Sequence, residues 1–204
     1  MKSVKLFSLN NLYAIILFII AVQICQYSGN RGIFPIDSFG HFDSGFRVLN
    51  GDHPFKDFWV ISGPLIDYLQ SLIFFLFGAN WQTYLLSSSL LNGLISLFTY
   101  YLLIRFGLNK NLSFFYSLCL SVLAYPSSGT PFVDHHSTFL SIMGLYTLLI
   151  AINTNNFFHW FLIPIFMLLA FLSKQVPAAY ILLSIIIITF IHLIYQKKKK
   201  LRSK

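Results

Sequence analysis

Apolar residues in this chain gather into seven long runs that are separated by short polar segments. Each run has the length expected of a helix that lies inside a membrane or at its surface. The runs cover residues 8–28, 64–78, 81–105, 111–126, 137–153, 157–173 and 176–196. The pattern therefore predicts an all-α, polytopic membrane protein.

The second run, 64–78, differs from the others. As a helix its 15 residues would reach about 22 Å, which is less than a hydrocarbon core of about 30 Å. It also contains the polar residues Asp67 and Gln70. Because Pro64 suits a first turn and Gly78 suits a C-cap, we expect a helix that lies in the membrane interface. About six transmembrane helices remain, with one or two interfacial helices in the first loop.

Basic residues decide the orientation of the six expected spans. If 64–78 does not cross, the following groups all face the cytoplasm: Lys2, Lys5, Arg105, Lys110 and the tail 197–204. This arrangement satisfies the positive-inside rule, whereas a crossing would put most of these groups outside. We therefore expect one transmembrane module over residues 1–196, with external loops at 29–80 and 127–136. The first span is expected to be uncleaved, and both termini to be cytoplasmic.

Composition supports this class and excludes others. The chain is 56% hydrophobic and 10% charged, with a mean hydropathy of +0.71. Soluble domains carry roughly 25% charged residues, so an ordinary soluble or disordered chain is excluded. The net charge of +8 is not a nucleic-acid signal, because six of the 14 basic residues lie in the last eight positions. Cys25 and Cys119 lie inside apolar runs and are expected to be core residues rather than a disulfide.

All six acidic residues are aspartates, and each lies on the expected external side. Acidic residues contribute little to topology, so membrane insertion does not explain this distribution. Two explanations remain: acids belong in loops and this loop is the longest, or the external side carries an acidic functional site. The six aspartates are Asp37, Asp43, Asp52, Asp57, Asp67 and Asp134.

The first external loop contains an amphipathic segment. Its apolar positions have helical spacing and form one face: Phe39, Phe42, Phe46 and Leu49. Asp37, His41 and Ser44 fall on roughly the opposite face. This predicts a short helix on the membrane with its aromatic face down, ended by Gly51. Asp37 is either a site residue or a helix cap, and Asp43 is expected to pair with Arg47.

The second external loop contains Asp134, His135 and His136 in succession. We expect Pro131 to open a helix with Thr130 as its N-cap, which puts Asp134 in the first turn. Carboxylate and imidazole groups are ligands of Zn and Mn, and ionisable groups at this depth are commonly functional. Adjacent helical residues diverge by about 100°, so at most two of the three would share one ion. The alternative is a capping Asp134 with two interfacial histidines.

Two further external residues are candidates for a site. Lys174, followed by Gln175, lies in a tight external turn and departs from the positive-inside trend. A cation at the headgroup level suits a phosphate, although a turn lysine can also snorkel. Asp57 is either a catalytic acid or a residue that braces its loop. His159 and His192 are expected to be packing or interfacial residues.

These motifs, in this order, resemble the GT-C superfamily of membrane glycosyltransferases, in particular bacterial protein mannosyltransferases and lipid A aminoarabinose transferases. Asp37 matches the acid that starts a horizontal helix, and Gly51-Asp52-His53-Pro54-Phe55 matches the element that ends it. Gly63-Pro64-Leu65 to Leu76-Phe77-Gly78 matches the interfacial helix. Asp134-His135-His136 and Lys174-Gln175 match later external motifs. The resemblance covers roughly residues 8–190.

The resemblance implies an inverting transfer of sugar from a polyprenyl-phosphate donor to a hydroxyl of a lipid, glycan or protein acceptor. The reaction would take place on the external face of a bacterial inner membrane. Asp37 would be the general base, and Lys174, Gln175, His41 and Asp57 would bind substrate or phosphate. Asp134, His135 and His136 would bind a divalent ion (Mn, Mg or Zn) or the donor phosphate.

The chain departs from the family in two ways. Ser38 follows Asp37 where relatives commonly have a second acid, and family members commonly run to about twice this length. The resemblance therefore implies the N-terminal half of such an enzyme, or an inactive remnant. Two other functions compete with it: a non-catalytic membrane partner and a small lipid or sugar transporter. Nearly uncharged span centres count against a transporter.

Overall fold

The computed structural model describes residues 9–31 and 35–202, with side chains described for 11–31 and 39–198. Within these residues the regular structure is helical, apart from one bridge between Pro54 and Phe58. The elements are α1 (Leu9–Gly29), α2 (Pro35–Leu49), α3 (Leu65–Phe77), α4 (Trp81–Arg105), α5 (Lys110–Leu123), η1 (Tyr125–Ser127), α6 (Val133–Thr154), α7 (Phe157–Ser173) and α8 (Gln175–Arg202). The all-α prediction is confirmed.

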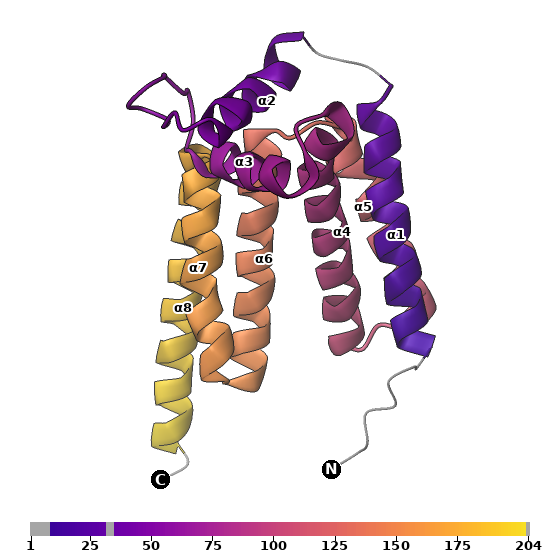
Figure 1. Ribbon diagram of the computed structural model, residues 1–204. Helices are drawn as coiled ribbons and strands as arrows, with labels where there is room; N and C mark the ends of the chain where they lie inside the picture. Colours follow the sequence, from indigo (N-terminus) through magenta and orange to yellow (C-terminus); the bar gives the residue numbers. More distant parts are fainter. Residues whose placement is uncertain (1–8, 32–34, 203–204) are drawn as a thin grey trace.

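The helices α1, α4, α5, α6, α7 and α8 run along one axis, while α2 and α3 cross one end of the bundle (Figure 1). In the described residues four helices are long and apolar enough to span a membrane, namely α1, α4, α6 and α8. The other two upright helices are shorter, with 14 residues in α5 and 17 in α7. At 1.5 Å per residue they reach about 21 Å and 26 Å. The predicted arrangement of upright and crossing helices is therefore present, but two of the six expected spans are short.

The upright helices pack in two groups of three. α1, α4 and α5 contact one another, as do α6, α7 and α8, and α4 joins the groups through α6. Buried polar side chains fasten the first group. The amide nitrogen of Asn92 donates to the carbonyl oxygens of Ala21 and Ser121, both at 2.9 Å. Such hydrogen bonds hold helices together where water does not compete.

α3 connects the two groups at the crossed end. It contacts α4 on one side and α7 on the other. Gly63, just before α3, donates its backbone N–H to the carbonyl oxygen of Ser173 at 3.1 Å. A Cβ atom at residue 63 would lie 1.9 Å from the carbonyl oxygen of Leu172. Only glycine allows this approach, which sets the start of α3 beside the turn that carries Lys174.

α2 lies on α3 rather than on lipid alone. The ring of Phe42 meets those of Phe74 and Tyr84 at centroid distances of 5.0 and 5.3 Å, and Phe39 meets Trp81 at 5.6 Å. The aromatic face was predicted to point into the membrane. That prediction is wrong for these two residues, because α3 and α4 offer them an aromatic surface.

Helix ends follow the sequence signals in part. Gly51 and Gly78 have positive φ, as expected of residues that end helices. α6, however, begins at Val133 with Phe132 as its N-cap and without a side-chain cap. The expected start at Thr130 and Pro131 is therefore wrong, although Asp134 still lies in the first turn.

Candidate functional site

A cavity of about 470 Å³ opens at the crossed end of the bundle, between α2, the segment 58–62 and the starts of α6 and α8. We call it the charged cavity. It is lined by Gly40, His41, Asp43, Ser44, Arg47, Phe58, Trp59, Val60, Ile61, Ser62, Phe132, Val133, Asp134 and Lys174. Trp59 is 78% exposed and Ile61 is 87% exposed, so large apolar side chains flank its polar groups. The cavity therefore offers both polar and apolar surface to a ligand.

Lys174 and Asp134 form an ion pair in this cavity. The Nζ atom of Lys174 lies 2.8 Å from Oδ1 and 2.9 Å from Oδ2 of Asp134. Both side chains are partly exposed. The turn is held in place because Ser137 donates its hydroxyl to the carbonyl oxygen of Lys174 at 2.8 Å. Two residues 40 positions apart are thereby brought into one site.

A second charged group, Asp67, lies behind the wall of the cavity. Nδ1 of His41 lies 2.9 Å from Oδ1 of Asp67, and the hydroxyl of Ser44 donates to the same oxygen at 2.5 Å. The Asp67 side chain is 0% exposed, whereas His41 retains 17% exposure. Since His41 also lines the cavity, Asp67 contacts the site only through other side chains.

Arg47 contributes a further cation. Its Nε atom lies 3.0 Å from Oδ2 of Asp52, and its guanidinium carbon lies 4.4 Å from the centre of the Phe58 ring. The expected pairing with Asp43 is wrong, because the turn after α2 brings Asp52 back to Arg47. Asp43 remains exposed at the cavity.

The histidines next to Asp134 point to other partners. Nδ1 of His136 lies 2.5 Å from the hydroxyl of Tyr125, and this imidazole is buried. Nε2 of His135 lies 3.2 Å from the hydroxyl of Ser127. Asp134 and His135 line a smaller hollow of about 300 Å³, which His136 does not line. The three residues therefore do not converge.

This geometry bears on the metal site expected at Asp134, His135 and His136. Among the described residues, no group of three or more His, Cys, Asp or Glu side chains could hold a metal ion. Both carboxylate oxygens of Asp134 contact the Lys174 ammonium, which competes with a cation for the same lone pairs. The described residues therefore do not fit the expected site of Asp134, His135 and His136.

Three other candidate residues are not among the described residues that line the charged cavity. Gln175 is the exposed first residue of α8. Asp57 lies in the loop, where its carboxylate accepts from the backbone N–H of His53 at 2.8 Å. This hydrogen bond, with Lys56 beside it, lowers the pKa of the Asp57 carboxyl. Asp37 lies in the first turn of α2, but its side chain is outside the described residues.

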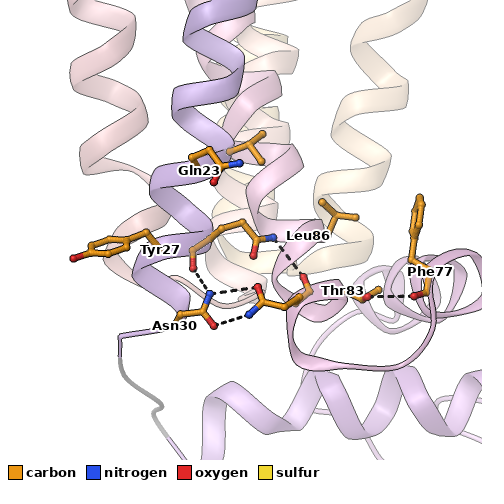
Figure 2. A pocket seen from close by; sticks show the side chains of 9 residues that line it. Gln23, Tyr27, Asn30, Phe77, Thr83 and Leu86 are labelled. Carbon is orange, nitrogen blue, oxygen red and sulfur yellow. Dashed lines mark hydrogen bonds between the residues drawn. The ribbon is translucent and has the colours of Figure 1, made fainter.

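A second hollow lies between the C-terminal end of α1 and the N-terminal end of α4 (Figure 2). We call it the amide hollow. Its lining differs chemically from that of the charged cavity. Gln82 and Asn30 exchange side-chain hydrogen bonds of 3.0 and 3.4 Å there. It is lined by Val22, Gln23, Gln26, Tyr27, Asn30, Phe77, Gln82, Thr83 and Leu86, none of which is charged. Its lining offers no cation to a phosphate, whereas the charged cavity does.

Sequence reasoning missed Asp67 as a site residue. Asp67 and Gln70 lie on the side of α3 that also carries buried Ile66, Ile73 and Phe74. Two polar residues on the apolar face of an amphipathic helix are a recognisable signal, because a buried polar group needs a partner. The partners, His41 and Ser44, could not be read from the spacing.

Comparisons with known proteins place the chain in a family. No curated protein and no solved structure matches it. One family model matches residues 52–204, which is more than half of the chain and includes α3 to α8. That match begins after His41 and Arg47, so it does not bear on the α2 side of the cavity. The chain belongs to the dolichyl-phosphate-mannose-protein mannosyltransferase family, whose members are membrane glycosyltransferases that use a polyprenyl-phosphate-linked sugar.

Proposed function

We propose that the protein moves a sugar from a polyprenyl-phosphate donor to an acceptor hydroxyl at the external face of a bacterial inner membrane, with inversion. One observation carries the proposal. The charged cavity combines the Lys174–Asp134 pair with His41 and Arg47, beside the exposed apolar residues Trp59 and Ile61. A lipid-linked phosphate needs cations and an apolar surface together.

Lys174 is proposed to bind the phosphate that leaves the sugar. When the bond between the anomeric carbon and the phosphate oxygen breaks, negative charge grows on that oxygen. A fixed ammonium group stabilises this charge, and such electrostatic stabilisation is a large part of many rate enhancements. Asp134 holds the ammonium through both carboxylate oxygens. Asp134 is thus a positioning residue for Lys174.

The acceptor oxygen forms a bond to the anomeric carbon on the face opposite the phosphate, and its proton must go to a base. The resemblance assigns that role to Asp37, which lies one turn before His41 on α2. One base opposite one leaving group is sufficient for inversion. The acceptor is proposed to be a lipid, a glycan or a protein.

The membrane orientation supports an external site. α2 and α3 lie at the end of the bundle opposite the end of α8, where the basic tail begins (Figure 1). The positive-inside rule puts this tail in the cytoplasm. The charged cavity then opens on the external side, where polyprenyl-phosphate sugars would meet envelope acceptors.

A transfer assay with a matched lysine control tests the proposal. The full chain in nanodiscs is given polyprenyl-phosphate [14C]mannose and an extract of envelope lipids and glycans. Wild type should move label into the extract, and Lys174→Ala should do so at least tenfold more slowly. Lys110→Ala, an exposed lysine at the start of α5, should match wild type. No transfer by wild type, or equal rates for both variants, contradicts the proposal and favours a non-catalytic partner.

A further inference from the structure

Asp67 is a fully buried carboxylate whose contacts lead to the charged cavity. Its Oδ1 atom lies 2.9 Å from Nδ1 of His41 and accepts from the Ser44 hydroxyl, while Oδ2 has no hydrogen-bond partner in the described residues. The described residues give Asp67 one ion-pair partner, His41. An ionised carboxylate that is taken out of water is costly unless an opposite charge lies beside it. An imidazolium at His41 would supply this opposite charge at 2.9 Å.

The geometry fixes which nitrogen of His41 is left for a ligand. A carboxylate only accepts hydrogen bonds, so Nδ1 must be the nitrogen that donates to Asp67. Nε2 has no hydrogen-bond partner among the described residues, and the ring lines the charged cavity. In the imidazolium form Nε2 also carries a proton and can donate to an anion in the cavity.

Charged groups from every wall of the cavity surround this imidazole. α2 contributes Asp43 and Arg47, α3 contributes Asp67, α6 contributes Asp134, and the turn before α8 contributes Lys174. Arg47 is paired with Asp52, and Lys174 is paired with Asp134. His136 lies on α6 as a further titratable group, but it is buried against Tyr125. Among the described residues, Asp67 is therefore the acidic group in direct contact with His41.

We propose that Asp67 holds His41 as an imidazolium whose Nε2–H donates to a phosphate oxygen of the lipid donor, beside Lys174. This inference rests on the proposed function, because it takes the ligand of the charged cavity to be a lipid phosphate. Asp67 acts as a positioning residue and does not touch the ligand. Binding of the anion is thereby linked to binding of a proton, because the anion binds best when His41 beside Asp67 is protonated.

A phosphodiester probe separates the protein's titration from that of the ligand. Farnesyl methyl phosphate has one ionisable oxygen, which stays ionised from pH 5.5 to 8.5, and its chain resembles the donor lipid. Its affinity for the full chain in nanodiscs is measured by calorimetry across this range. Wild-type affinity should fall as pH rises, because the proposed Nε2–H donor needs its proton, by up to about tenfold per pH unit, as for one linked proton.

Three variants test the assignment. His41→Gln should bind more weakly at pH 6 and show no fall with pH. Asp67→Asn should bind more weakly than wild type at pH 6, because the imidazolium loses its counter-charge. His53→Gln, which alters a loop histidine bonded to Tyr68, should retain the wild-type curve. Far-UV circular dichroism checks that each variant is folded.

The outcomes distinguish this inference from the proposed function. Lack of binding by wild type at every pH overturns both the His41–Asp67 assignment and the proposed function. Binding by wild type with a flat pH curve, or an unchanged pH dependence in His41→Gln, overturns the His41–Asp67 assignment alone. In that second case Lys174→Ala should still weaken binding, and the proposed function stands.

Discussion

Polar side chains in this protein gain their chemistry from partners that are remote in the chain. Lys174 faces Asp134 across two helix ends, and His41 faces Asp67 across the α2–α3 contact. Each pair joins a partly exposed cation of the cavity wall to a carboxylate from another element. The residues that we propose to touch the ligand and those that we propose to position them should therefore respond differently to substitution.

Asp37→Asn tests the base that the family resemblance assigns. The change keeps the shape and the capping ability of the side chain but removes its proton acceptor. Transfer should slow by about 10²–10⁴-fold, as is usual when a general base is lost. Affinity for polyprenyl-phosphate mannose should change less than threefold, because Lys174 remains. Turnover near the wild-type rate would show that Asp37 is a helix cap only.

At the scale of elements, the site depends on how α3 is fastened between α4 and α7. The backbone N–H of Gly63 donates to the carbonyl oxygen of Ser173, one residue before Lys174. The position of the lysine turn is therefore coupled to the start of α3. α2 in turn follows α3, because Phe42 packs on Phe74.

Gly63→Ala should loosen this junction. The added Cβ would lie 1.9 Å from the carbonyl oxygen of Leu172, so the backbone must move. Overpacking of this kind costs about 1–3 kcal/mol, and thermal unfolding in detergent should show a lower Tm. Gly40→Ala is the control, because a Cβ there meets nothing within 4 Å. Equal Tm values for the two variants would contradict the claim that residue 63 has no room for a Cβ atom.

The sequence predicted the helices better than it predicted the contacts between them. Apolar runs identified the upright helices and the crossing helix α3, since the length and hydrophobicity of a segment determine whether it can span a membrane. The start of α6 was misplaced, because Pro131 and Thr130 carry a helix-start signal that the tertiary structure does not use. The pairing of Lys174 with Asp134 and the role of Asp67 depend on packing between distant segments, which spacing along one helix cannot reveal.

At the scale of the whole molecule, the two helix groups form a bundle with a polar end and an apolar body. The crossing helices close the polar end, and the last turns of α8 carry the start of the basic tail at the other (Figure 1). The positive-inside rule favours the orientation that puts the basic tail in the cytoplasm. The proposed external site depends on this orientation.

Cysteine labelling in intact cells tests the orientation. Lys56→Cys lies in the first loop, where the native side chain is 74% exposed, and Lys198→Cys lies near the end of α8. Both are made after Cys25 and Cys119 are replaced by alanine. A membrane-impermeant maleimide should label residue 56 in intact cells, and residue 198 only after the membrane is opened. Labelling of residue 198 in intact cells would refute cytoplasmic termini.

The central claim is that the charged cavity, and not the amide hollow, holds the lipid-linked donor. A photoreactive benzoylphenylalanine at position 59 reports on the first, and the same residue at position 27 reports on the second, since Trp59 and Tyr27 line these two sites. Both variants are irradiated with radiolabelled polyprenyl-phosphate mannose. We predict a covalent adduct at position 59 that unlabelled donor suppresses and that is several-fold stronger than at position 27. An adduct confined to position 27 would contradict the account.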